Sequence, residues 1–164
     1  MNKSFLAAIM LFLASTVNTY SCDTNDPICV ASMVFEKGAS LRFFELKDYY
    51  CEQNQVFLSE AIRRAEKRVS KLKRDKGIDH YEQVKIDFSD VEYSLISRDK
   101  EKAQVRVFGV FTYDLQGTDF HHQASTDEIM ELRYQNDRWM FCSEELANLS
   151  DRFKHANKEI KADD

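Results

Sequence analysis

Four cysteines are the residues of this 164-residue chain whose chemistry is easiest to define: Cys22, Cys29, Cys51 and Cys142. A thiol can form a disulfide, bind a metal or act as a nucleophile, and each role requires a different neighbourhood. Structural zinc requires clustered ligands, but the sequence has no C-x-x-C pair, and His121-His122 is not at helical ligand spacing. No cysteine lies in a recognisable activating motif. We therefore expect disulfides, and neither a metal nor another cofactor.

Four cysteines allow three pairings. Cys22 and Cys29 are seven residues apart and flank a polar segment with Asp26-Pro27, so they could close a small loop. Cys51 and Cys142 would then join an early helix to a late strand. Such a bridge would close a loop of about 90 residues, for which chain entropy predicts roughly 4–5 kcal/mol of stabilisation. If Cys22 were instead modified by a lipid, Cys29 would have no partner.

The first 21 residues are typical of an export signal. Lys3 precedes an unbroken apolar run of ten residues, Phe5–Ala14, and small and polar residues follow. The run is too short to span a bilayer comfortably, and it lacks the polar face expected of a buried N-terminal helix. No later segment is apolar over 18 residues. We therefore expect an exported protein that is periplasmic, secreted or anchored as a lipoprotein.

Lipid attachment at Cys22 is the less favoured of these alternatives. In bacterial lipoproteins the modified cysteine follows a small residue, with leucine three positions before it. Ser21 fits that pattern, but Thr19 and Tyr20 depart from it. Cleavage into a soluble exported form is preferred.

Composition indicates a single globular domain over residues 22–164. Hydrophobic residues make up 43% of the chain and aromatic residues 12%, which excludes a disordered chain. The net charge of −5 argues against a dedicated nucleic-acid-binding protein, although a local basic face remains compatible with it. We therefore expect no nucleic acid among the partners.

Helical periodicity dominates the first half of this domain. Asp26-Pro27 predicts the start of a helix. A second helix is predicted from Gln53 to Lys73, with Gly77 ending the helical run. Residues 63–76 are strongly basic. This basic helix could contact an acidic membrane or a partner, but an ordinary solvated face is the favoured interpretation.

Strand periodicity dominates the second half. Apolar residues alternate over Val84–Phe88 and again, shifted by one residue, over Val91–Leu95, which predicts a bulge near Ser89-Asp90. Further strands are predicted over Val105–Tyr113 and as a final pair around Asn136-Asp137. Together these strands form an antiparallel meander.

Helices followed by a meander predict an α+β fold. We expect N-terminal helices packed on a bent antiparallel four-stranded sheet, with an extra C-terminal helix over residues 144–160. Gly109 lies in the middle of a predicted strand, where glycine often permits a sharp bend. Trp139 on the last strand is the expected core anchor.

This layout resembles the nuclear transport factor 2-like superfamily, also called the cystatin-like cone fold, and especially its small exported bacterial members of unknown function. The resemblance rests on the helical region Ala31–Leu72, the strands Val84–Ser97 and Gln104–Leu115, and the ending Ile129–Cys142. Some exported relatives carry one cysteine early and one at the end, which fits a bridge between Cys51 and Cys142. A helix after the last strand is not part of the usual unit.

The resemblance also implies where a pocket would lie. Enzymes of this superfamily line the cone with Tyr, Asp or His placed for proton transfer. The matching candidates are Tyr93, Tyr113, Asp114, His121 and His122. Because no acid–base spacing distinguishes them from residues that simply pack a sheet, we assign no catalytic residue.

The favoured hypothesis is a non-enzymatic exported domain that acts as a binding or assembly module at the cell envelope. The alternative is a small-molecule pocket protein or an isomerase-like or dehydratase-like enzyme. The expected partner is an unidentified protein or a small ligand. A second copy of the chain, which would give a homodimer, is one such protein. Membrane attachment is considered through a lipid on Cys22 or through the basic helix 63–76.

Overall fold

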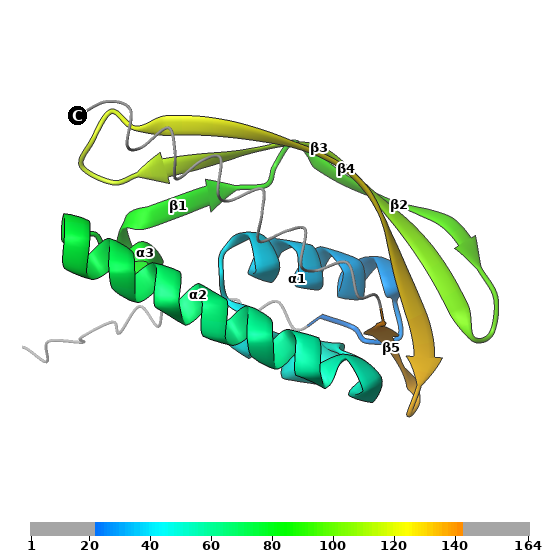
Figure 1. The fold of residues 1–164 in the computed structure, drawn as a ribbon. Helices are drawn as coiled ribbons and strands as arrows, with labels where there is room; N and C mark the ends of the chain where they lie inside the picture. Colours follow the sequence, from blue (N-terminus) through cyan, green and yellow to red (C-terminus); the bar gives the residue numbers. More distant parts are fainter. Residues whose placement is uncertain (1–21, 143–164) are drawn as a thin grey trace, which may run out of the picture.

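Helices lie on one side of a strongly curved antiparallel sheet in the computed structural model, which describes residues 22–142 (Figure 1). The predicted α+β class is confirmed. The expected export signal (1–21) and C-terminal helix (144–160) lie outside the described residues. The elements in chain order are α1 Pro27–Ala39, the 3-10 helices η1 Phe43–Tyr49 and η2 Glu52–Asn54, α2 Gln55–Lys76, α3 His80–Gln83, β1 Val84–Asp87, β2 Val91–Arg98, β3 Lys102–Leu115, β4 His121–Gln135 and β5 Arg138–Phe141.

Helix α1 begins at the predicted position and ends at Ala39. The Asp26 carboxylate accepts a hydrogen bond from the Ile28 N–H at 2.9 Å, as an N-cap does. At the other end, the Ser40 N–H and hydroxyl both donate to the Glu36 carbonyl, at 3.0 and 2.7 Å. Leu41 then adopts a left-handed φ of 58°. The apolar residues beyond this turn belong to η1, a separate helix.

Helix α2 ends at the predicted glycine and packs mainly against η1. Gly77 has a φ of 69°, and its N–H donates to the Lys73 carbonyl at 3.0 Å. A glycine in this left-handed conformation is the usual end of a helix. Leu58 and Ala65 are buried on the inner side of α2.

The sheet is the predicted meander, with one strand in two pieces. Strand β3 pairs along its length with β4, and β5 pairs with the end of β4. On the other edge of β3, β1 pairs with its last residues and β2 with its first half. Strands β1 and β2 therefore act as one strand interrupted at residues 88–90, where the sequence predicts a bulge.

Gly109 allows the sheet to bend at that interruption. Its φ is 140°, and a Cβ atom there would lie 2.1 Å from the Asp90 carbonyl oxygen. The same carbonyl accepts a hydrogen bond from the Val110 N–H at 3.2 Å. Only glycine fits such a close approach of two backbones. The bulge predicted near Ser89-Asp90 and the bend predicted at Gly109 thus occur at the same backbone contact.

The core lies between α1 and the inner face of the sheet. Alternate residues of β3 point inward, and Val105, Val107 and Phe111 are buried. The Phe35 ring of α1 contacts the Phe111 ring edge-to-face, with centroids 5.6 Å apart. Trp139 is buried on β5, as expected of a core anchor.

Two disulfides join segments of the described chain. Cys22 bonds to Cys29 and Cys51 bonds to Cys142, with Cα–Cα distances of 5.7 and 5.1 Å, within the ordinary range. A thioether lipid on Cys22 would require the same sulfur atom, so this disulfide-bonded form is incompatible with lipidation there. Two disulfides indicate an oxidising, extracytoplasmic environment. Within residues 22–142, none of the helices has the length and apolar character needed to cross a membrane.

Candidate functional site

Strand alternation divides the predicted pocket residues between the two faces of the sheet. Tyr93 lies opposite the buried Val107, so both point inward toward α1. Tyr113 is also buried on the inner face. Asp114 is the next residue on the same strand and points outward, and His121 lies opposite it on β4. The structure therefore does not bring these four side chains into one pocket.

Asp114 and His121 form a surface pair on the outer face. The His121 Nδ1 lies 2.7 Å from the Asp114 Oδ1, and both side chains are more than half exposed. An exposed pair of this kind contributes little to stability, because water competes with it. Because both side chains are open to solvent, we assign the pair no role in proton transfer.

Tyr113 and His122 belong to the aromatic packing of the inner face. Their ring centroids are 6.2 Å apart, and the Phe111 ring lies 5.4 Å from that of Tyr113. Burial raises the pKa of the Tyr113 phenol well above its usual range, so the phenol is neutral. These contacts are typical of a packed core.

A carboxylate that the sequence analysis missed faces Tyr93. The Tyr93 hydroxyl donates a hydrogen bond to the Glu36 Oε1 at 3.1 Å, linking β2 to α1. Burial raises the pKa of Glu36, although the hydrogen bond from Tyr93 and the charge of Lys37 oppose this shift. Burial, together with the neighbouring Glu36 charge, also raises the pKa of Tyr93. Glu36 is the only acidic residue in α1. An acid that stands alone in a helix was the feature of the sequence that could have identified it.

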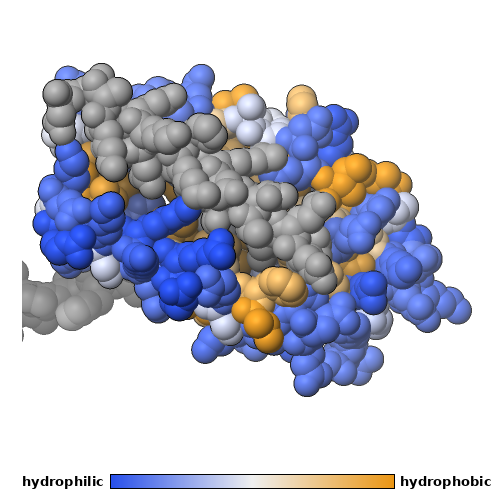
Figure 2. All heavy atoms as spheres, in the orientation of Figure 1, coloured by the Kyte–Doolittle hydropathy of each residue, from blue (hydrophilic) through white to orange (hydrophobic). Residues whose placement is uncertain are grey.

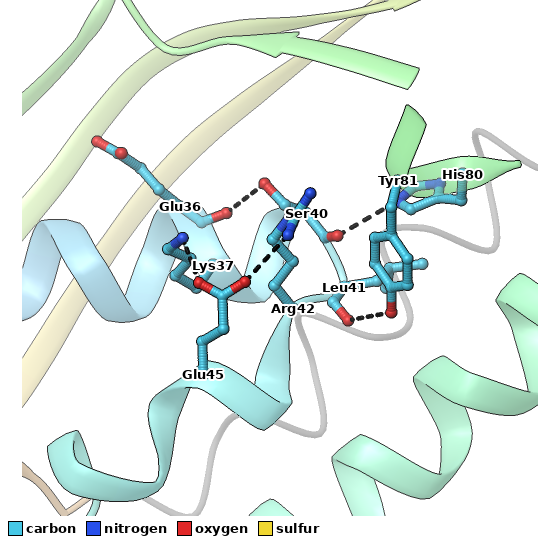
Figure 3. Close-up of polar contacts among 8 residues, drawn as sticks. All are labelled: Glu36, Lys37, Ser40, Leu41, Arg42, Glu45, His80 and Tyr81. Atoms are coloured by element: carbon cyan, nitrogen blue, oxygen red, sulfur yellow. Dashed lines mark hydrogen bonds and ion pairs between the residues drawn. The ribbon is translucent and has the colours of Figure 1, made fainter. Parts of the chain in front are cut away.

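A second polar cluster joins the end of α1 to η1 (Figure 3). Lys37 and Arg42 both contact the Glu45 carboxylate, and the Arg42 Nη1 lies 3.0 Å from its Oε1. Partial burial opposes ionisation of Glu45, but the hydrogen bonds from Lys37 and Arg42 outweigh it and lower the pKa of this carboxyl. The cluster thus holds the turn between two helices.

Helix α3 closes the same turn from the other side (Figure 3). The His80 Nε2 lies 3.2 Å from the Ser40 carbonyl oxygen, and the Tyr81 hydroxyl donates to the Leu41 carbonyl at 3.3 Å. These contacts satisfy backbone carbonyls where α1 ends. Burial lowers the pKa of His80, which favours the neutral imidazole. The hydrogen-bond partners of His80 and Tyr81 are backbone oxygens, so we assign this arrangement a structural role.

An open groove of about 420 Å³ lies beside the β2–β3 turn, at one end of the sheet. Its lining carries charges of both signs and none of the predicted pocket residues. The lining residues are Ser97, Arg98, Asp99, Lys102, Ala103, Gln104, Glu131, Leu132, Arg133 and Cys142. No group of three or more metal-ligating side chains occurs among the residues that the structure describes.

The outer face of the sheet carries an apolar patch that the sequence analysis did not single out. Phe108, Val110 and Ile129 are 49%, 38% and 56% exposed. Between them, Arg106 binds Asp127 through two hydrogen bonds, at 2.9 and 3.0 Å, and its guanidinium lies 4.9 Å from the Phe108 ring centroid. We name these five residues the outer patch. Their outward direction follows from alternation along β3 and β4.

Comparisons with known proteins give one match to a solved structure. No protein-family model matches this sequence, and no curated protein matches it either. The solved structure is a Campylobacter jejuni protein titled "Putative NTF2-like transpeptidase", with a TM-score of 0.37 and 15% identity, covering 73% of this chain and 99% of that chain. The match is to an NTF2-like structure, and its TM-score and identity are too low to assign a family or an activity.

Proposed function

We propose that this protein is an exported, non-enzymatic assembly module of the cell envelope, which binds a second copy of itself through the outer patch. The observation that supports this proposal is the position of the patch. The helices α1, α2 and α3 lie on the inner side of the sheet (Figure 1), so none of the described helices covers the outer side. Apolar side chains in the middle of a sheet face that no described helix covers are typical of protein interfaces.

The chemistry of the outer patch suits contact between two copies. Phe108 and Ile129 supply apolar area, while Arg106 and Asp127 supply one charge of each sign on the same surface. In a two-fold dimer each side presents the same patch, so a patch with both charges can be complementary to itself. Aromatic residues and arginine are also the types that contribute most at interfaces.

Export is supported by two independent features. The N-terminal sequence is typical of an export signal, and both disulfides are of the kind that persists outside the cytoplasm. The module would therefore act in a periplasmic or secreted setting. Sedimentation of the oxidised chain with and without Phe108→Ser tests the proposal, because loss of the central aromatic ring should weaken the dimer.

A second candidate function is that of a small-molecule pocket protein, and the Glu36–Tyr93 pair favours it. A half-buried acid with a raised pKa beside a phenol could bind or protonate a polar ligand group. Turnover by the purified chain that disappears in both Glu36→Gln and Tyr93→Phe, and survives in Asp114→Asn, would support this candidate. That result would also contradict the non-enzymatic assembly module.

A further inference from the structure

Helix α2 concentrates positive charge in an acidic protein. It contains eight basic and three acidic residues, a net charge of +5, within a chain whose net charge is −5. The basic residues are Arg63, Arg64, Lys67, Arg68, Lys71, Lys73, Arg74 and Lys76. Such a separation of charge produces a strong local field, although the whole molecule repels anions.

The cations of α2 form a stripe on its exposed side. Arg63, Lys67, Lys71 and Arg74 follow one another at steps of three or four residues, so they lie on one face over about 16 Å. The end of α2 at the left of Figure 2 is accordingly strongly hydrophilic. The stripe therefore faces solvent along the C-terminal half of the helix.

The ion pairs within the stripe leave it able to bind an external anion. Arg63 and Arg64 share the Glu60 carboxylate, and Arg74 binds Asp75. The three arginine side chains are 52–74% exposed, so these pairs are weak and can be exchanged for other anions. Within the described part of the chain, Lys67 and Lys71 form no ion pair. A lipid phosphate could reach both of them directly.

Exposed apolar residues precede the stripe on the same helix. Val56 is 77% exposed and Phe57 is 44% exposed in the first turn of α2. Val56 lies seven residues before Arg63, which is two turns along the same side. A cationic stripe alone would fit any polyanion, whereas a cationic stripe with an apolar end fits a bilayer interface.

We propose that α2 binds the surface of a bilayer that contains anionic phospholipid. The cations of the stripe contact the lipid phosphates, and Val56 and Phe57 insert at the headgroup level. This attachment requires no lipid on Cys22, whose sulfur is bonded to Cys29. It uses a different surface from the outer patch, so it neither requires nor excludes self-association.

Co-sedimentation with vesicles tests this proposal. The oxidised chain from residue 22 to residue 164 is mixed with vesicles of phosphatidylcholine alone, or of phosphatidylcholine with phosphatidylglycerol. We expect binding only to the anionic vesicles, weakened by added salt. Lys67→Glu with Lys71→Glu should lower the affinity at least tenfold, because each cation near an anionic bilayer contributes about fivefold.

Two further variants separate the stripe from net charge and from folding. Lys100→Glu with Lys102→Glu makes the same change of charge at two exposed positions, in the β2–β3 turn and at the first residue of β3, and should retain most of the binding. Val56→Ser should weaken binding to anionic vesicles while leaving the circular dichroism spectrum unchanged. Equal losses for both double variants would overturn the proposal. So would equal binding to both vesicle types, or binding to heparin without binding to vesicles.

Discussion

The hydroxyl of Tyr93 on β2 donates a hydrogen bond to the carboxylate of Glu36 on α1, across 57 residues of sequence. This bond joins the inner face of the sheet to the helix that packs against it. Burial raises the pKa of the Glu36 carboxyl above its ordinary value, so the folded protein retains this proton to higher pH than the unfolded chain does. The pair therefore links the stability of the fold to pH.

Replacement of Glu36 by Gln should change the pH dependence of stability. As pH rises above the ordinary pKa of glutamate, the unfolded chain loses its proton first, so the wild-type protein is destabilised until the folded pKa is passed. The free energy of unfolding of Glu36→Gln, relative to wild type, should therefore increase between pH 4 and pH 7. Urea denaturation at several pH values measures it. A constant difference would contradict the raised pKa, and Glu92→Gln on the outer face is the control.

His80 should make the protein less stable as the pH falls. Burial lowers the pKa of its imidazole, so the unfolded chain binds a proton first when pH falls below about 6.5. The wild-type protein should lose stability over that range, and His80→Gln should lose less. Thermal denaturation between pH 7.5 and pH 5 shows the difference. If His121→Gln, at an exposed position, removed the slope instead, the assignment to His80 would be wrong.

Gly109→Ala should be strongly destabilising. The new Cβ would lie 2.1 Å from the Asp90 carbonyl oxygen, and the φ of 140° is itself unfavourable for alanine. Strain and steric overlap together should reduce the free energy of unfolding by about 3 kcal/mol or more. Gly77→Ala is the matched control, because its φ is also positive but no atom lies near the new Cβ. We expect a loss of only about 1 kcal/mol there, and equal losses would refute the close contact.

The two disulfides should contribute unequally to stability. The bridge from Cys51 to Cys142 spans 91 residues, and the bridge from Cys22 to Cys29 spans 7. Chain entropy predicts about 4–5 kcal/mol for the long loop and about 2 kcal/mol for the short one. Paired Cys→Ser variants, compared by denaturant unfolding, measure both contributions. Peptide mapping of the oxidised chain should recover the same two pairs, and free thiols at Cys51 and Cys142 would refute the long bridge.

Much of the fold is predictable from the sequence because its signals are local. The N-cap at Asp26, the glycine at the end of α2 and the phase shift between β1 and β2 each depend on a few neighbouring residues. The first half of β4 is different. His121–Glu128 is polar and lacks an apolar alternation, and it is a strand because β3 offers a complete row of backbone partners. A pairing of that kind depends on tertiary context.

The candidate site was less predictable, although some of its geometry was available. Tyr113 and Asp114 are adjacent in a strand, so alternation alone requires their side chains to point to opposite faces. Strand alternation alone therefore places the predicted pocket residues on different faces of the sheet, without a structure. The partner of Tyr93 could not be found in the same way, because Glu36 lies on a different element. The outer patch could not be predicted either, because alternation along a strand does not show which face of the sheet the helices cover.

Sedimentation velocity over a series of concentrations tests the proposed assembly most directly. The oxidised wild-type chain from residue 22 to residue 164 should sediment as a dimer at high concentration and dissociate on dilution. Phe108→Ser with Ile129→Ser should remain monomeric throughout, while Val56→Ser, which removes an exposed apolar side chain from α2, should still dimerise. A wild-type protein that stays monomeric at the highest soluble concentration, or a double variant that dimerises as well as wild type, would contradict assembly through the outer patch.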